Sequence, residues 1–281
     1  MTLRSGAGVT GWAALRWLGG RWFTGRGPDG FSLLPVPIAS ALHMRQQRGT
    51  QVTQERISPR DLTVHEGVVL TTAVRSVFQG MRAASTDLDA AIVAEMAMFN
   101  DLVSRDELTR YVLAHGRFHG IARARSCLAC LDENSWSPQE VRMRWIWLAA
   151  ELPRPLCNTP VFTRDGHLVG VPDLLDEEAG LIGEYDGAHH LDVAQRRRDI
   201  QREAEFRRLG LEYVTMVAGE DPARVADRLR AARARCAHRA PSARAWSLEP
   251  PSWWIQTDSV VARRELYGTR HEHRLGHRRI I

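Results

Sequence analysis

Val171-Pro172-Asp173 is followed, after ten residues, by Glu184-Tyr185-Asp186-Gly187-Ala188-His189-His190. The apolar runs that hold these polar groups, residues 168–175 and 180–186, predict two neighbouring strands. Because side chains alternate along a strand, Glu184 and Asp186 share one face of it. If the two strands pair antiparallel, Asp173 and Glu184 come within bridging distance of one divalent ion.

The segments around these strands predict one compact α/β domain over residues 137–237. Ser137-Pro138-Gln139-Glu140 is the pattern of a helix start, with a serine cap, proline at the first helical position and glutamate at the third. A strand at residues 160–162 pairs with the strand at 168–175 as a hairpin around the Asp165-Gly166 turn. The expected order is helix, three strands, helix, strand, helix, with the last three elements at residues 192–209, 211–217 and 222–237.

The acidic residues of this domain have the chemistry of a magnesium site. Carboxylate oxygens are hard ligands of the kind Mg²⁺ prefers, and such a site leaves positions open for water and phosphate oxygens. The helix that follows is rich in arginine, whose planar fork matches phosphate geometry and supplies sequence-independent affinity for DNA. Acidic pairs beside a basic helix therefore indicate a metal-dependent nuclease. The arginines expected to bind nucleic acid are Arg196, Arg197, Arg198 and Arg202.

Residues 137–220 resemble the PD-(D/E)xK nuclease superfamily, in particular its very-short-patch-repair-like endonuclease branch. The resemblance rests on Glu140, Pro172-Asp173, Glu184-x-Asp186-Gly187, His189 or His190, and Asp199 with Arg202. It implies a restriction-endonuclease-like core, a central mixed β-sheet flanked by helices, with Mg²⁺ or Mn²⁺ at Asp173 and Glu184 and DNA as substrate. The catalytic residues that it implies are Glu140, Asp173, Glu184, Asp186, His189 and His190.

The lysine of the superfamily motif is missing from this chain. Asp186 occupies its position, and all 38 Lys and Arg residues are arginine. The very-short-patch-repair-like branch commonly carries an acid there and a histidine shortly after it. His189 or His190 is therefore expected to act as the general base, since imidazole titrates near the working pH.

The chain outside this domain has a different character. Residues 1–85 predict a mixed, β-rich region, residues 86–136 a helical connector, and residues 238–281 a tail rich in Trp, Arg and His. The part before the nuclease-like domain resembles the AbiEi-antitoxin-like region of actinobacterial proteins that join the two. Those relatives usually begin with a winged helix, which the pattern here does not predict. The resemblance leaves a protein partner such as a toxin, or a homodimer, as open alternatives.

The composition indicates which partners and which cellular location to expect for the protein. A net charge of +5 and an isoelectric point of about 9.5 favour a polyanionic partner. No apolar run approaches about 18 residues, so neither a membrane span nor a membrane partner is expected. The first residues lack the apolar core of a signal peptide, and a cytoplasmic protein is the expectation. Four cysteines in 281 residues do not form a disulfide scaffold.

Each candidate residue also has a structural explanation. Glu140 completes a helix cap, Asp173 can be a polar residue at a strand end, and histidines that follow a glycine can cap the next helix. An arginine run is usually a solvated face. Two other functions therefore stay open. One is a catalytically silent DNA-binding antitoxin or transcriptional regulator of AbiEi type, and the other is a protein-interaction module whose acids are only structural.

Overall fold

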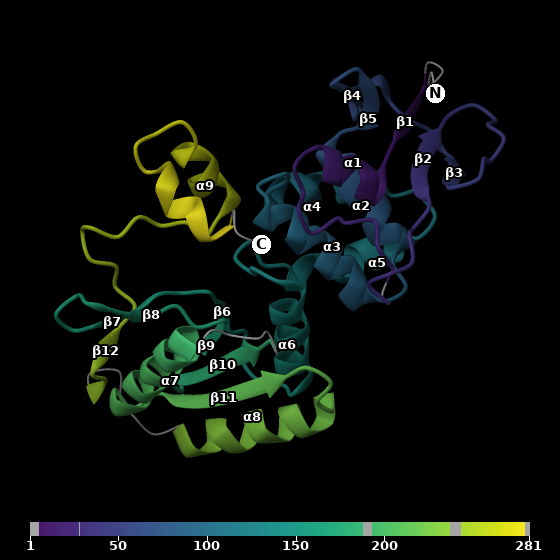
Figure 1. The fold of residues 1–281 in the computed structure, drawn as a ribbon. Helices are drawn as coiled ribbons and strands as arrows, with labels where there is room; N and C mark the ends of the chain where they lie inside the picture. The colour runs from purple at the N-terminus through teal and green to yellow at the C-terminus, as the bar shows by residue number, and fades with distance from the viewer. Residues whose placement is uncertain (1–5, 28, 188–192, 237–242, 279–281) are drawn as a thin grey trace. The chain divides into compact units, whose positions relative to one another are not determined.

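The chain folds into two compact units in the computed structural model, which describes residues 6–27, 29–187, 193–236 and 243–278 (Figure 1). Unit 1 comprises Met1–Glu133 together with Ser259–Ile281, and unit 2 comprises Asn134–Asp258. The units divide the chain differently from the four predicted segments. Residues 1–85 and 86–136 share unit 1 up to Glu133, and the segment 238–281 is divided between the units.

Unit 1 contains one mixed five-stranded sheet with the order β3-β2-β1-β5-β4. Strands β1 and β2 pair antiparallel, as do β4 and β5, whereas β1–β5 and β2–β3 are parallel. Strands β4 and β5 form a hairpin around Glu66-Gly67, and both turn residues have positive φ, 48° and 78°, as a two-residue hairpin requires. The strands are β1 (Ala7–Val9), β2 (Val36–Ser40), β3 (Thr50–Gln54), β4 (Leu62–His65) and β5 (Val68–Thr71).

Helix α2 is the centre of the helical part of unit 1, since it packs against α1, α3, α4 and α5. The residues after position 86 are helical as predicted, but α3, α4 and α5 pack on α2 instead of forming a separate connector. The helices described in unit 1 are α1 (Gly11–Trp17), η1 (Pro59–Asp61), α2 (Ala73–Ala83), α3 (Asp87–Phe99), α4 (Arg105–Ala114), α5 (Ile121–Ser126), η2 (Leu128–Cys130), α9 (Val260–Leu266) and η4 (Glu272–Arg278).

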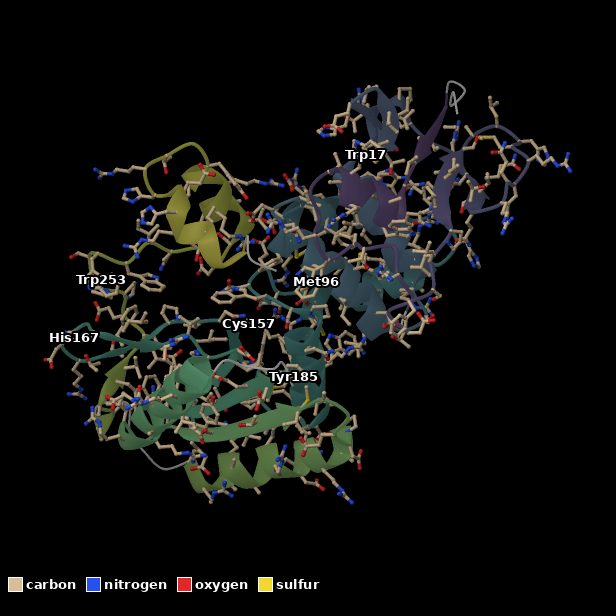
Figure 2. All side chains as sticks on the ribbon, in the orientation of Figure 1. Trp17, Met96, Cys157, His167, Tyr185 and Trp253 are labelled. Carbon is tan, nitrogen blue, oxygen red and sulfur yellow. The ribbon has the colours of Figure 1, made fainter. Side chains whose placement is uncertain are left out.

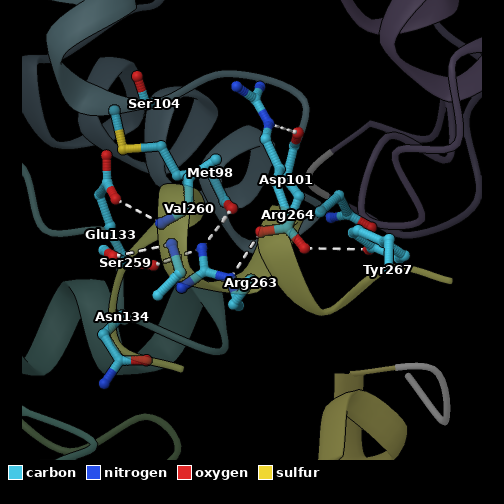
Figure 3. A network of polar contacts seen from close by, with 12 residues as sticks. Met98, Asp101, Ser104, Glu133, Asn134, Ser259, Val260, Arg263, Arg264 and Tyr267 are labelled. Atoms are coloured by element: carbon cyan, nitrogen blue, oxygen red, sulfur yellow. Dashed lines mark hydrogen bonds and ion pairs between the residues drawn. The ribbon is translucent and has the colours of Figure 1, made fainter. Parts of the chain in front are cut away.

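A network centred on Arg263 joins α9 to the rest of unit 1 (Figure 3). The Arg263 side chain is fully buried, and its Nε lies 2.6 Å from Oδ1 of Asp101. Its Nη2 donates to the carbonyl oxygen of Met98 at 2.8 Å, and the backbone N–H of Val260 donates to Glu133 Oε2 at 2.6 Å. We refer to these contacts as the Arg263 network. Because they join residues up to 165 positions apart, the end of the chain belongs structurally to its first half.

Unit 2 contains two sheets, a mixed four-stranded one with the order β11-β10-β9-β6 and a three-stranded one with the order β12-β7-β8. The predicted strand 168–175 is two strands, β8 and β9, that lie in different sheets. Pro172 separates them, since proline has no N–H to continue a ladder. The strands are β6 (Leu156–Cys157), β7 (Val161–Thr163), β8 (Leu168–Gly170), β9 (Leu174–Asp176), β10 (Leu181–Asp186), β11 (Glu212–Val217) and β12 (Trp246–Ser247).

Helices cover both faces of the four-stranded sheet. One core packs Trp147 of α6 and Leu229 of α8 against Leu181 and Met216 of the sheet. The other packs Phe206 of α7 against Leu175 and Ile182. The fold is therefore mixed α+β, with mixed sheets flanked by helices, and Figure 1 shows α7 and α8 on opposite sides of the sheet. These helices are α6 (Pro138–Ala149), α7 (Val193–Arg208) and α8 (Pro222–Cys236).

The tryptophans that follow α8 pack on unit 2, as expected for side chains of this size. Trp246 is buried in β12, which pairs with β7. Trp253 and Trp254 lie against the ring of Phe162, with centroids 5.9 and 5.4 Å away, and Figure 2 shows Trp253 near the three-stranded sheet. Among the described residues, no helix has both the length and the apolar character needed to cross a membrane.

Candidate functional site

The backbone brings the two predicted metal ligands to neighbouring positions. Strands β9 and β10 pair antiparallel, with Gly183 opposite Leu174, so the next pair in the register is Glu184 opposite Asp173. The backbone N–H of Tyr185 donates to Asp173 Oδ2 at 2.8 Å, which fixes the Asp173 side chain against the edge of β10. The antiparallel pairing on which the predicted site depends is therefore confirmed.

Glu184 is a buried carboxylate with one oxygen engaged. Its Oε2 lies 2.9 Å from Nη2 of Arg202, which reaches it from α7. Its other oxygen, Oε1, is buried and accepts no well-formed hydrogen bond from the residues that the structure describes, although the Tyr213 hydroxyl is close enough to lower the pKa of Glu184. An unsatisfied buried acceptor is costly, by about 1–3 kcal/mol, so this oxygen favours a ligand that can bind it.

The pKa values of both acids are shifted upward. Burial raises the pKa of Asp173 well above its usual value, and the negative charges of Glu140 and Glu184 raise it further. Burial also raises the pKa of Glu184, while Arg202 and the Tyr213 hydroxyl oppose that shift. We call Glu140, Asp173 and Glu184 the carboxylate cluster, in which Asp173 is repelled by the other two acids where little water screens the charges.

Glu140 has a structural role and is also a member of this cluster. The Ser137 side chain accepts from the Glu140 backbone N–H at 3.2 Å, which is the predicted N-cap of α6. The Glu140 carboxylate accepts from the backbone N–H of Trp136, one residue before the expected partner, and from Asn158 Nδ2, both at 2.7 Å. Asn158 also donates its backbone N–H to the carbonyl oxygen of Asp173 at 3.0 Å, and so ties the first helix to β9.

A pocket of about 190 Å³ opens on the α7 side of the cluster. Strand alternation places Glu184 and Asp186 of β10 on the same face, beside Tyr213 of β11. The pocket is lined by Glu184, Tyr185, Asp186, Asp199, Ile200, Arg202, Glu203, Tyr213 and Thr215. Its wall therefore carries acidic groups, one arginine and a tyrosine hydroxyl.

The other predicted site residues lie around this pocket or outside the described part. Asp186 is exposed at the end of β10, and Arg197 and Arg198 are exposed on α7. Arg202 does not face outward as Arg197 and Arg198 do, because its guanidinium binds Glu184. His189 and His190 fall outside the described residues, as does the side chain of Arg196.

Two residues of the site were not predicted from the sequence. Tyr213 faces Glu184 because β10 and β11 are parallel neighbours, and burial together with the charge of Glu184 raises its pKa. The alternation of β11 could have placed Tyr213 on the α7 face, but only if its pairing with β10 had been known. Asn158 has a positive φ of 44°, and nothing in the sequence around it predicts its contact with Glu140.

The residues present fit a hard divalent cation. Glu184 Oε1 is a buried oxygen without a described partner, and two carboxylates with solvent ligands are a usual protein contribution to Mg²⁺. Across the part of the chain that the structure describes, no group of three or more His, Cys, Asp or Glu side chains is arranged to hold a metal ion. A cation here would therefore be bound by Asp173 and Glu184 with water or substrate oxygens. No family model, curated protein or solved structure matches the chain.

Proposed function

We propose that unit 2 is a restriction-endonuclease-like domain that hydrolyses phosphodiester bonds in DNA with Mg²⁺ or Mn²⁺. The observation that carries the proposal is that Asp173, directly before β9, is held against β10 by the Tyr185 N–H next to Glu184, which has a buried oxygen without a described hydrogen bond. The upward pKa shifts of both acids support it, because perturbed carboxylates are typical of functional sites, and Glu184 lines the pocket.

Each residue of the cluster has a distinct role in this proposal. Asp173 and Glu184 hold the cation, which supplies polarisation of the scissile phosphate and a lowered pKa of bound water. Glu140 adds negative charge behind Asp173 and, through Asn158, keeps the helix start in place. Asp186, at the rim of the pocket, extends the acidic surface toward the substrate.

The basic groups near the site would bind and orient the substrate. Arg197 and Arg198 are exposed on α7, where a DNA backbone could reach them. Arg202 contacts Glu184 at 2.9 Å and so places a positive charge beside the proposed cation site, where it would compete with a weakly bound cation. The proton acceptor in the proposal is His189 or His190, which follow β10 in the chain.

The test is cleavage of supercoiled plasmid and single-stranded DNA by the full chain, with Mg²⁺ or Mn²⁺ and with EDTA. The wild-type protein should cleave only with metal, and Glu184→Gln should lower the rate by about 10³-fold or more, since the metal supplies several kcal/mol at the transition state. Glu212→Gln is the matched control, because Glu212 also lies on the sheet but pairs with Arg235. Equal cleavage by wild type and Glu184→Gln would contradict the proposal.

The second candidate is a catalytically silent DNA-binding protein that uses the same basic surface. The observation that favours it is that Arg202 already supplies a positive charge to Glu184. Under this alternative, wild type and Glu184→Gln bind DNA equally and neither cleaves it. Binding would weaken as salt rises, because phosphate contacts release counterions.

A further inference from the structure

Unit 1 holds a second pocket, much larger than the one at the carboxylate cluster. Its volume is about 810 Å³, within the usual range for small-molecule sites. It lies entirely within this unit, between the end of β3, the second half of α2 and the loop that follows α4. None of the residues of this pocket takes part in the proposed nuclease.

The charged side chains of this pocket are predominantly positive. Its walls contain Arg56, Arg82 and Arg117, with Glu55 as the carboxylate. Both oxygens of Glu55 are already engaged, since Oε1 lies 2.6 Å from Arg75 and Oε2 lies 2.7 Å from Arg82. The Glu55 carboxylate is therefore already paired with Arg75 and Arg82. The pocket thus offers hydrogen-bond donors and positive charge to a ligand.

Two arginines next to the pocket, Arg75 and Arg82, carry positive charge that is buried in the protein. Arg75 is fully buried, and its Nε and Nη1 have no hydrogen-bond partner among the described residues, nor does Nε of Arg82. Burial lowers the pKa of Arg82, and Glu55 opposes that shift. An anion held in the pocket would stabilise these cations by charge alone, without touching the buried atoms, because the protein interior screens weakly.

Aromatic contacts hold this wall of the pocket together. The Arg82 guanidinium lies against both Phe78 and Phe118, 4.7 and 4.8 Å from their centroids, and the two rings contact each other edge to face at 5.4 Å. Its Nη1 donates to the carbonyl oxygen of His119 at 2.9 Å. Gly120 follows with φ of +77°, where a Cβ would lie 2.7 Å from the Arg82 carbonyl oxygen. The loop after α4 is thus fixed against α2, and the wall needs little reorganisation to bind.

We propose that this pocket binds a nucleotide-sized organic phosphate. Arginine forks bind phosphate oxygens in bidentate geometry, and Arg56 and Arg117, both exposed, line the pocket after β3 and after α4. The amides of Gln51, Gln54 and Gln79 line the same space and can pair with the polar edge of a base or sugar. The volume favours a larger organic phosphate, because inorganic phosphate would fill only a small part of it.

The experiment is isothermal titration calorimetry of the full chain with each of the four common ribonucleoside monophosphates, the corresponding nucleosides and inorganic phosphate. At least one nucleotide should bind more tightly than its nucleoside and than inorganic phosphate. Arg117→Gln and Arg56→Gln should each weaken that binding by about tenfold, a loss of one charge-assisted contact. Both positions are exposed, so the variants are expected to fold.

Arg60→Gln is the matched control, an exposed arginine of unit 1 that does not line the pocket. It should bind the nucleotide like the wild-type protein. The proposal is overturned if no nucleotide binds, if nucleoside or inorganic phosphate binds as tightly as the nucleotide, or if Arg117→Gln and Arg56→Gln leave the affinity unchanged. Glu184→Gln should not alter nucleotide binding, so this result is independent of the nuclease proposal.

Discussion

Arg263 of unit 1 and Arg202 of unit 2 each bind a buried carboxylate, but the two groups differ in how completely they are satisfied. Arg263 is enclosed by Asp101, the Met98 carbonyl oxygen and the Glu133 carbonyl oxygen, and none of its nitrogens is a buried donor without a partner. Arg202 binds Glu184 with one nitrogen, while its Nε and Glu184 Oε1 are both buried without described partners.

The difference separates a structural network from a site that is prepared for a ligand. The Arg263 network fixes α9 to the first half of the chain, and its carboxylate is fully used (Figure 3). The carboxylate cluster keeps three acids together against their mutual repulsion, which lowers the stability of unit 2 unless a cation is bound. Functional sites commonly retain such unfavourable arrangements because activity requires them.

The largest expected effect is the loss of the Arg263 network. Asp101→Asn should lower the free energy of unfolding of unit 1 by about 3 kcal/mol, because it leaves the charge of a buried arginine uncompensated. Asp101 has φ of 58°, a region that asparagine also tolerates, so the backbone contributes little to the change. Urea denaturation measures it, with Asp106→Asn on the exposed side of α4 as control. A change below about 1 kcal/mol would show that this network is not essential to the docking of α9.

The second prediction concerns the positive charge that the Arg202 side chain places next to Glu184 in the carboxylate cluster. Removal of a positive charge next to a cation site strengthens cation binding, so Arg202→Gln should bind Mn²⁺ about tenfold more tightly than the wild-type protein. Calorimetric titration with Mn²⁺ measures the change. Arg208→Gln, which removes an exposed pair with Glu205 on the same helix and away from the pocket lining, is the control and should behave as wild type. Weaker binding by Arg202→Gln would mean that Arg202 helps to build the cation site.

A smaller effect, opposite in sign to that of Asp101→Asn, is expected at Asp173. Asp173→Asn should raise the free energy of unfolding of unit 2 by about 1 kcal/mol while it abolishes cleavage, because it removes a repelling charge and keeps the acceptor for the Tyr185 N–H. Asp176→Asn, three positions along the chain, should lower stability, since Asp176 is paired with Arg233 at 2.8 Å. If both variants are destabilised equally, the cluster is not under electrostatic stress.

The same stress predicts a small dependence of stability on pH. The pKa of Asp173 is higher in the folded chain than its usual value of 3.8, so protonation favours the folded state. The destabilisation is therefore absent below the usual value and grows as the pH rises through the raised pKa. Lowering the pH from about 7 to about 5 should narrow the stability difference between Asp173→Asn and the wild-type protein. A difference that stays constant over this interval would contradict the upward shift.

The local elements of the fold could be predicted from the sequence, and the long-range ones could not. The Glu66-Gly67 hairpin and the Ser137 cap are set by residues close together in the chain. Asp173 and Glu184 could be paired because only one short connection separates their strands. The docking of α9 depends on Arg263 and Asp101, 162 positions apart, and no local pattern signals it.

Within the site, the direction of long side chains was the hardest feature to predict. Arg202 was grouped with the arginines that face DNA, but it turns inward to Glu184 because α7 packs on that face of the sheet. The interruption at Pro172 could have been predicted, since a proline inside a long apolar run argues against one continuous strand. The contacts of Asn158 depend on a left-handed backbone position that its neighbours do not signal.

The measurement that tests the account most directly is calorimetric titration of Mn²⁺ into the full chain, wild type against Glu184→Gln, with Glu212→Gln as control. We predict one site in the wild-type protein and in the control, and an affinity at least about 100-fold lower in Glu184→Gln, which loses a direct ligand. Absence of binding by the wild-type protein, or equal binding by wild type and Glu184→Gln, would contradict the cation site. Unit 2 would then be a structural or DNA-binding domain whose carboxylate cluster is neutralised by Arg202 alone.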